Sequence, residues 1–214
     1  MQRNDFTSAL IIVGLTGSIG MGKSTTANLF RDAGIPVFDS DAMVHRLQAR
    51  GGEALPLIEA EFHGVVKDGE LDRQALGDVV FKSPDKLKRL EGIMFPLLHE
   101  RRRNFFAHAL RSGADMVIVD VPLLFETGGD QAVDFVVVVD APAEVQRARV
   151  LDRDGMTPEK FENILEKQMP NRDKVTRADY IIDTNNGIEA AATQVANVIA
   201  AIRDQVQKKN MEIL

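Results

Sequence analysis

The sequence predicts an α/β fold in which a parallel sheet carries a phosphate-binding loop. Five short apolar runs alternate with stretches of helical spacing, as expected for parallel strands that are buried on both faces. The glycine-rich segment GLTGSIGMGKSTTA, residues 14–27, directly follows the first run. A long helical stretch between the second and third runs exceeds what one strand crossover needs. It predicts a separate part of the chain that holds a substrate.

The glycine-rich segment has the features of a loop that binds a nucleoside triphosphate. Gly17, Gly22, Lys23 and Ser24 fit the pattern G-x-x-x-x-G-K-[ST]. Glycine lets backbone N–H groups turn toward phosphate oxygens, and the following helix N-terminus favours negative charge. The lysine then reaches the β- and γ-phosphates and the serine hydroxyl can ligate Mg²⁺. The pattern leaves open whether the protein is a switch, a motor or a kinase.

The elements follow in the order that such a sheet requires. The helix after the loop ends at Gly34, where a left-handed residue stops it, and Pro36 blocks its continuation. A last helix, from about Ile188 to Val206, has one apolar side that is expected to pack on the sheet. The predicted strands are Ala9–Leu15, Ile35–Phe38, Met116–Val121, Asp134–Asp140 and Asp179–Asp183.

Two segments interrupt the simple alternation of strands and helices. Residues 43–112 give only helical signals, with Asp72 and Ser83-Pro84 as helix starts. Residues 145–175 are helical and rich in arginine, with Thr157-Pro158 as a further start. We therefore predict three parts. A nucleotide-binding core is formed by residues 9–42, 113–144 and 176–214. An acceptor-binding helical domain is formed by residues 43–112, and a helical lid by residues 145–175.

Composition excludes several classes of protein. The 214 residues carry a net charge of −6, which argues against a general nucleic-acid binder. The absence of cysteine excludes disulfides and thiolate sites, and fits a reducing cytoplasm. The polar start MQRNDFTS predicts neither a signal peptide nor a membrane anchor. We expect a cytoplasmic monomer or weak homo-oligomer with small-molecule substrates, and neither nucleic acid nor membrane as a partner.

Carboxylates at strand ends are the candidates for chemistry. Asp39 and Asp41 follow the second strand, so they are expected near the γ-phosphate, because the carboxyl ends of parallel strands share one crevice. One is expected to act in catalysis, and the other to cap the next helix or to orient metal. Asp120 and Asp140 each end a later apolar strand, and the pattern does not choose between them as the Walker B acid. Glu126 is either a site residue of the unusual VPLLFE segment or a solvated loop residue.

Arginines form the second set of candidates. Arg149 and Arg153 lie four residues apart, on one face of a helix in the predicted lid, where guanidinium groups can neutralise a transferring phosphoryl group. The alternative is surface pairing with Asp152 and Asp154. The run Arg101 to Arg103 is either a solvated helix face or a holder of phosphorylated substrate.

Taken together, these motifs resemble the dephospho-CoA kinase family over roughly residues 10–200. The resemblance rests on VGLTGSIGMGKST, GIPVFDSDAMVH, LDRQALGDVVF, VDVPLLFE, QRARVLDRDGMT with EKQM beyond it, and RADYIIDTNNG. It implies a P-loop nucleotide-kinase core that transfers the γ-phosphate of ATP to the ribose 3′-hydroxyl of dephospho-CoA with Mg²⁺, the last step of coenzyme A synthesis.

The resemblance also implies roles for individual residues. The catalytic residues would be Asp41 as general base, with Lys23 and Arg149, and Ser24 would be the metal ligand. The nucleotide would be bound by Gly17, Ser18, Ile19, Gly20, Met21, Gly22, Lys23, Ser24, Thr25 and Arg149, with Asp183 and Asn185 near the adenine. The acceptor would be bound by Asp39, Asp41, Leu71, Asp72, Arg73, Phe95, Pro122, Leu123 and Glu126.

The sequence departs from the family pattern at one position, and three other functions have to be weighed against the kinase assignment. Phe95 stands before Pro96 where the family resemblance leads us to expect histidine, and phenylalanine cannot donate a hydrogen bond. Another kinase of the same core, acting on a nucleotide or nucleoside, is the nearest rival. A regulatory GTPase would need an N-K-x-D element, which the sequence lacks. A structural ATPase module would not need a second, substrate-holding domain.

Overall fold

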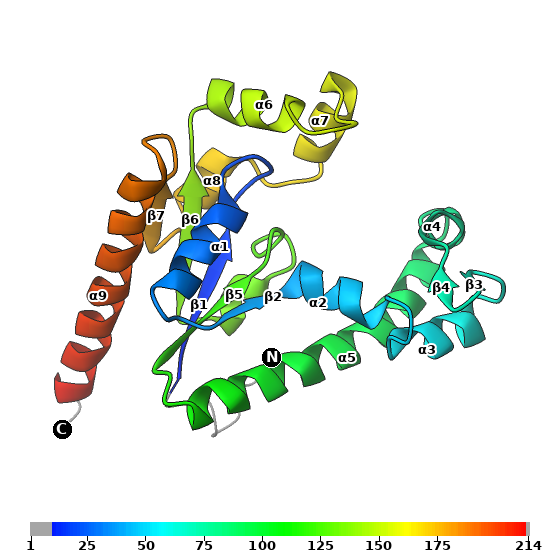
Figure 1. Cartoon of the computed structure of the whole chain (residues 1–214), viewed down its shortest axis with the longest axis horizontal. Helices are drawn as coiled ribbons and strands as arrows, with labels where there is room; N and C mark the ends of the chain where they lie inside the picture. Colours follow the sequence, from blue (N-terminus) through cyan, green and yellow to red (C-terminus); the bar gives the residue numbers. More distant parts are fainter. Residues whose placement is uncertain (1–9, 213–214) are drawn as a thin grey trace. The chain divides into compact units, whose positions relative to one another are not determined.

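The computed structural model describes residues 10–212 and has the predicted α/β fold (Figure 1). Within these residues the main sheet has the spatial order β2-β5-β1-β6-β7, and the pairs β1/β5, β1/β6 and β6/β7 are parallel. The strands are β1 (Ile11–Thr16), β2 (Val37–Asp39), β5 (Met116–Asp120), β6 (Phe135–Asp140) and β7 (Tyr180–Asp183). The prediction of a five-stranded parallel sheet is confirmed. Ala9 and the polar segment MQRNDFTS lie outside the described residues.

The chain divides into two compact units, which are described separately. Unit 1 comprises the residues up to Val37 and from Ala109 onward, and unit 2 comprises Phe38–His108. The predicted boundaries at 43 and 112 lie within five residues of these divisions. The separate lid, residues 145–175, stays a prediction, because that segment belongs to unit 1.

The core of unit 1 lies between its sheet and two helices. Val13, Leu15, Ile118 and Val137 are fully buried β-branched or leucine side chains of the strands. Burying such side chains contributes about 1.5–3 kcal/mol each. Helix α1 contacts β1, β5 and α9, and α9 contacts β7 (Figure 1). The helical segments of this unit are α1 (Lys23–Asp32), the 3₁₀ helix Gly129–Ala132, α6 (Ala143–Leu151), α7 (Pro158–Leu165), α8 (Asn171–Val175) and α9 (Ile188–Glu212).

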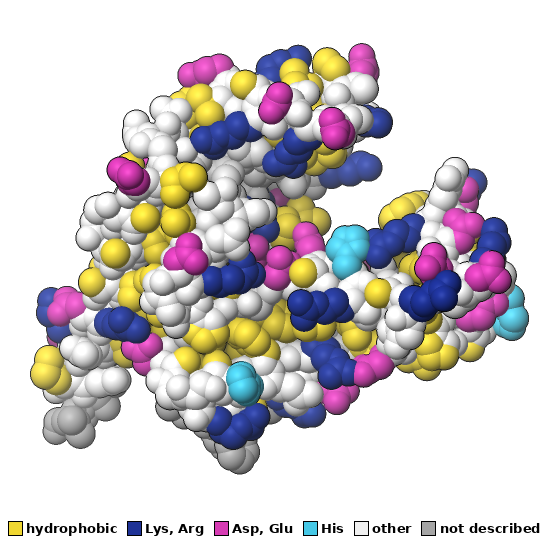
Figure 2. All heavy atoms as spheres, in the orientation of Figure 1, with side chains coloured by type: hydrophobic (Ala, Val, Ile, Leu, Met, Phe, Trp, Pro, Cys, Tyr) yellow, Lys and Arg dark blue, Asp and Glu magenta, His cyan; other side chains and the backbone are white. Residues whose placement is uncertain are grey.

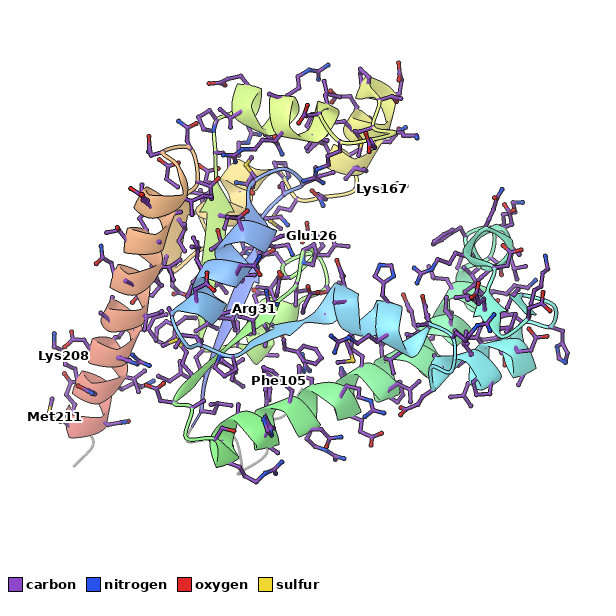
Figure 3. The ribbon with its side chains drawn as sticks, in the orientation of Figure 1. Arg31, Phe105, Glu126, Lys167, Lys208 and Met211 are labelled. Carbon is purple, nitrogen blue, oxygen red and sulfur yellow. The ribbon has the colours of Figure 1, made fainter. Side chains whose placement is uncertain are left out.

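Unit 2 has its own apolar core. Its fully or nearly buried members include Leu47, Ala54, Ile58 and Val80, which come from three helices. In addition, Phe38 and Phe105 pack with their ring centroids 5.4 Å apart; Figure 3 labels Phe105 on α5. The helices of this part of the chain are α2 (Ser40–Leu47), α3 (Ala54–Glu61), α4 (Arg73–Val80) and α5 (Pro84–Arg111), the last of which continues into unit 1.

The expectation of helices alone between residues 43 and 112 is wrong at one place. Strands β3 (Val66–Lys67) and β4 (Glu70–Leu71) form an antiparallel hairpin. The two residues that connect them, Asp68 and Gly69, have φ angles of 52° and 77°. An Asp-Gly pair is well suited to such a tight turn, because both residues tolerate positive φ. The strands have only two residues each, too few for an alternating pattern to be visible in the sequence.

The predicted helix starts are present as capped N-termini. The Asp72 side chain accepts a hydrogen bond from Ala75 N at 2.9 Å, and the Thr157 hydroxyl accepts one from Lys160 N at 3.3 Å. Pro158 then occupies the first helical position. These caps satisfy amides that the helix cannot satisfy itself, and so fix where α4 and α7 begin.

Candidate active site

The phosphate loop joins β1 to α1 at the carboxyl end of the sheet in unit 1. Gly22 is the residue before α1 and has a φ of 89°, a left-handed conformation that glycine adopts without strain. Gly17 is required for a different reason. A Cβ on it would lie 2.3 Å from Val139 Cγ2, so the loop could not pack so closely on β6. Two of the motif glycines are therefore explained by backbone conformation and by close packing.

The first turn of α1 is open to an anion. Ser24 and Thr25 are exposed, and the turn contains no acidic side chain. Backbone N–H groups at a helix N-terminus and the helix dipole both favour a phosphate there. The loop can therefore receive the phosphates of a nucleotide, as the sequence pattern predicts.

Lys23 faces a buried carboxylate at the end of β5. Its Nζ lies 2.5 Å from Asp120 Oδ1, and the Asp120 side chain is only 3% exposed. Asp120 is paired in register with Leu15, directly before the loop. Asp140, the other candidate left open by the sequence, instead accepts a hydrogen bond from Asn171 Nδ2 at 2.6 Å. The geometry favours Asp120 as the Walker B acid.

The donor set fits a magnesium ion that is held mainly by its nucleotide. Among the described residues, no group of three or more His, Cys, Asp or Glu side chains is arranged to hold a metal ion. Mg²⁺ typically keeps several waters and takes one or two protein ligands together with substrate phosphates. The exposed hydroxyl of Ser24 and the carboxylate of Asp120 are the groups near the loop that suit this role.

The first half of the loop is held by side chains that the sequence analysis missed. Ser18 N donates to Asn171 Oδ1, and Ile19 N donates to Gln168 Oε1, each at 2.9 Å. Gln146 Nε2 donates to Ile19 O at 2.7 Å. These residues are 127 to 153 positions away in sequence, so no local pattern indicates the contacts. Gln168 lies in the EKQM segment, but the motif alone did not reveal its role.

Arg149 bonds within unit 1 rather than to the acids beside it. Its Nη1 donates to Thr184 Oγ1 at 2.9 Å, and its Nη2 donates to Thr184 O at 2.7 Å. Thr184 Oγ1 also lies 2.9 Å from Met21 O in the phosphate loop. Arg149 is thus connected to the phosphate loop through Thr184. The alternative, in which Arg149 pairs with Asp152 or Asp154 at the surface, does not match the partners that it has in the structure.

The other arginines of the predicted lid segment differ in their surroundings. Arg147 pairs with Glu162 at 3.0 Å and lies over the ring of Phe161, 6.0 Å from its centroid. Arg153 is exposed. Figure 2 shows Lys and Arg side chains gathered over α6 and α7, with acidic side chains among them. This part of unit 1 therefore presents cationic groups to solvent.

The residues expected near adenine form a tight turn after β7. Asp183 Oδ1 accepts a hydrogen bond from Asn185 N at 2.8 Å, and its Oδ2 accepts one from Asn186 Nδ2 at 2.7 Å. Asn185 itself is exposed. Asp183 shapes the turn, and Asn185 is the more exposed of the two predicted residues.

The VPLLFE segment forms the loop that follows β5. Pro122 O accepts hydrogen bonds from Thr16 Oγ1 at 3.0 Å and from Lys174 Nζ at 2.9 Å. Leu123 is 39% exposed. Glu126, labelled in Figure 3, accepts hydrogen bonds from Met169 N and Lys174 Nζ through Oε1. It is therefore not simply a solvated loop residue, and its predicted contact with substrate stays a prediction.

Glu126 leads to a prediction about pH. Partial burial raises the pKa of Glu126, but Lys174 and Met169 N together hold that pKa below its usual value. A lowered carboxylate pKa adds stability above the unfolded pKa of about 4.3, and this stability disappears as the pH falls through the lower folded pKa. We expect the difference in unfolding midpoint between the wild type and Glu126→Gln to be constant from about pH 6 to 8 and to shrink below about pH 4. Urea denaturation across this range measures it, and a difference that grows on acidification would contradict the assignment.

In unit 2, Asp39, the last residue of β2, and Asp41, in α2, have different surroundings. Asp39 Oδ1 accepts a hydrogen bond from Ala42 N at 2.8 Å and so caps α2. Asp41 lies in the first turn of α2 and is exposed. The expectation that one of the pair acts as a cap is thus met by Asp39, which leaves Asp41 as the accessible carboxylate.

The LDR segment and Phe95 also lie in unit 2. Asp72 caps α4 and pairs with Lys67 at 2.9 Å; the bond from Ala75 N and this pair hold the pKa of Asp72 below its usual range. Leu71 ends the hairpin, and Arg73 begins α4 and is exposed. Phe95 is 51% exposed, and its ring stacks on His99 with centroids 6.5 Å apart.

The arginine run on α5 is not a uniform solvated face. Arg101 pairs with Glu53, and Arg102 is half-buried, which lowers the pKa of its guanidinium. Arg103 is exposed. These contacts lie within unit 2 and do not by themselves indicate a phosphate site.

Comparison with known proteins identifies the family. A family model described as "Dephospho-CoA kinase" matches residues 11–190. The chain belongs to the dephospho-CoA kinase family. The dephospho-CoA kinase of Mesorhizobium japonicum is 53% identical over 196 residues, 92% of this chain and 98% of that protein. That of Rhodopseudomonas palustris strain HaA2 is 50% identical over 192 residues, 90% of this chain and 96% of that protein.

Solved structures agree with the family assignment. A crystal structure from Thermus thermophilus has 35% identity and a TM-score of 0.78, and covers 91% of this chain and 98% of its own. The structure of dephospho-CoA kinase from Campylobacter jejuni has 25% identity and a TM-score of 0.64, and covers 90% and 97%. The resemblance noted from the motifs is confirmed. No helix among residues 10–212 is long and apolar enough to cross a lipid bilayer.

Proposed function

We propose that the chain transfers the γ-phosphate of ATP to the ribose 3′-hydroxyl of dephospho-CoA, giving coenzyme A and ADP. Membership of the dephospho-CoA kinase family supports ATP-dependent phosphorylation of dephospho-CoA in coenzyme A biosynthesis. The single observation that carries the proposal is the match of the family model to residues 11–190, which include the phosphate loop. In that loop, the N-terminus of α1 and the side chain of Lys23 can bind the phosphates of ATP, the phosphoryl donor.

In this proposal, residues Gly17 to Thr25 hold the ATP phosphates. Lys23 balances charge on the β- and γ-phosphates, and Ser24 and Asp120 supply the protein side of a Mg²⁺ site. When bound, Mg²⁺ would neutralise charge that develops on the phosphates. Asn185 and Asp183 contribute to the adenine site, and Arg149 acts on the nucleotide.

The acceptor is assigned to residues that carry the family's motifs in unit 2 and after β5. Asp41 is the proposed base, supported by its exposure and by the capping role of its neighbour Asp39. Carboxyl ends of parallel strands share one edge, which is the reason for expecting a carboxylate after β2 to serve the reaction. The acceptor-binding residues proposed are Asp39, Asp41, Leu71, Asp72, Arg73, Phe95, Pro122, Leu123 and Glu126.

We further propose a cytoplasmic protein that acts as a monomer or weak homo-oligomer. The cysteine-free composition supports a reducing compartment. Size-exclusion chromatography with light scattering measures the oligomeric state directly. A stable dimer at micromolar concentration would contradict this part of the proposal.

A coupled ADP-release assay with a panel of acceptors tests the function. The panel is dephospho-CoA, AMP, CMP and adenosine, each with ATP and Mg²⁺. We expect kcat/KM to be highest for dephospho-CoA. Equal or faster ADP release with AMP or CMP would favour the rival reading as a nucleotide kinase, and omission of Mg²⁺ should abolish release with every acceptor.

For the lid, Arg149→Lys is expected to lower turnover more than ATP affinity. Lysine keeps the charge but loses the planar fork that now reaches both Thr184 O and Thr184 Oγ1. Steady-state kinetics with ATP titration measure both quantities. Thr184→Val is the matched comparison: if it reproduces the whole defect, Arg149 acts through Thr184 rather than on phosphate. A kinetically silent Arg149→Lys would remove Arg149 from the site.

A further inference from the structure

Lys174 is a buried cation for which the proposed reaction gives no role. Its side chain is 0% exposed, and its Nζ lies 2.8 Å from Glu126 Oε1. The same Nζ donates to Pro122 O at 2.9 Å. An ammonium group is costly to bury unless it is paired and hydrogen-bonded, and here both conditions are met.

The pair of Lys174 and Glu126 holds two segments together, the loop after β5 and the segment that leads into α8. Glu126 Oε1 also accepts a hydrogen bond from Met169 N at 2.8 Å, and so holds the segment 168–171. Figure 3 labels Glu126 in the loop after β5 and Lys167 just before that segment. Lys174 lies on α8, which begins at Asn171 and contacts β6. The pair therefore ties the loop after β5 to the segment that leads into α8.

The segment 168–171 in turn holds the phosphate loop. Gln168 and Asn171 accept hydrogen bonds from the amides of Ile19 and Ser18, and Met169 O lies 3.4 Å from Ser18 Oγ. Asn171 Nδ2 also donates to Val139 O at 3.2 Å. The ion pair is thus connected to the phosphate loop by a short series of direct hydrogen bonds.

We propose that Lys174 and Glu126 are a positioning pair for ATP: they hold segment 168–171 so that Gln168 and Asn171 fix the first half of the phosphate loop. The inference rests on the proposed role of residues 17–25 as the ATP phosphate site. A loop that is fixed before binding loses less conformational entropy when the nucleotide arrives, so loosening it lowers affinity. On this account Glu126 serves the donor nucleotide through segment 168–171, and this role replaces the acceptor contact proposed for it above.

Lys174→Met tests the pair, with Arg203→Met as the matched control. Methionine keeps length and apolar volume but removes the charge and the hydrogen bonds. Arg203 pairs with Asp115 at 2.7 Å, directly before the start of β5, whereas Glu126 lies in the loop that follows the end of β5. The readouts are melting temperature, calorimetric Kd for the non-hydrolysable β,γ-imido analogue of ATP, and Kd for dephospho-CoA, all measured well below the melting temperature.

The expected result is a Kd for the ATP analogue raised by about tenfold or more in Lys174→Met, with the Kd for dephospho-CoA changed less than about twofold. Arg203→Met should lower the melting temperature and leave both affinities unchanged. Lys174→Arg, which restores a cation, should recover most of the ATP affinity. A Lys174→Met protein that melts earlier but binds the ATP analogue like the wild type would overturn the proposal.

Two further outcomes are decisive. If the affinity for dephospho-CoA falls while that for the ATP analogue does not, Glu126 and Lys174 serve the acceptor, and the proposal is wrong. If Lys174→Met does not fold, the double variant Lys174→Met with Glu126→Leu decides, because it leaves no unpaired buried charge and removes the hydrogen bond from Met169 N; unchanged ATP affinity in that variant overturns the proposal. The Kd for the ATP analogue is measured without any phosphorylation of dephospho-CoA. A failure of the proposed function would therefore appear in the ADP-release assay and not in this binding measurement.

Discussion

Lys23→Ala is expected to lower kcat by about 10³-fold or more, because phosphoryl transfer depends on charge stabilisation by positioned cations. The lysine is proposed to contact the β- and γ-phosphates, where charge accumulates in the transition state. In the described structure its Nζ lies 2.5 Å from the carboxylate of Asp120, which is 3% exposed. Removing the lysine therefore also affects the environment of a buried acid. The ADP-release assay with dephospho-CoA measures the loss.

A second variant separates the catalytic effect from the stability effect. Replacing Asp120 by Asn in the Lys23→Ala background removes the buried charge that Lys23 faces. Stability should recover in this double variant, while activity should not. If Lys23→Ala turns over at a near-normal rate, the assignment of residues 17–25 as the phosphate site is wrong.

Asp41→Asn is expected to lower kcat by about 10²–10⁴-fold, the range that positioned bases supply. A ribose hydroxyl is a weak nucleophile as the neutral alcohol, so a carboxylate that accepts its proton during transfer should help. Asparagine keeps the shape of aspartate but cannot take the proton. The KM for dephospho-CoA should therefore change little while kcat falls.

Asp39→Asn is the control, because the structure gives Asp39 a capping role that asparagine can replace. Asp39 caps α2 through Ala42 N, and asparagine is about as good an N-cap as aspartate. Asp39→Asn should thus be close to wild type in stability and in kcat. A large loss in Asp39→Asn together with a normal Asp41→Asn would show that the other carboxylate is the base. Full activity in both variants would leave catalysis to positioning, Mg²⁺ and the arginines.

Local signals explain why much of the fold could be predicted. The strands are continuous apolar runs, and Asp72 and Thr157 cap helices with their own side chains, so each feature is visible within a few residues. The signal for the family is equally local, because it consists of short motifs: the phosphate loop, the LDR segment and VPLLFE. The β3–β4 hairpin was missed because its strands have only two residues each.

The parts of the site that could not be predicted are long-range contacts. Gln168 and Asn171 hold the amides of Ile19 and Ser18 across 149 and 153 residues of sequence. The bond from Lys174 to Pro122 O spans 52 residues. No periodicity or spacing indicates which distant polar side chain a loop amide will meet. Similarly, the choice between Asp120 and Asp140 depends on which strand end faces Lys23.

The position of the phosphate on the product tests the central claim most directly. Wild-type protein, ATP, Mg²⁺ and dephospho-CoA are incubated to completion, and the product is analysed by ³¹P NMR and by mass spectrometry of its fragments. The proposed function predicts one new phosphate monoester on the ribose 3′-oxygen, in one-to-one ratio with ADP. ADP formed without a phosphorylated acceptor, or a phosphate on any other atom of the acceptor, would contradict it.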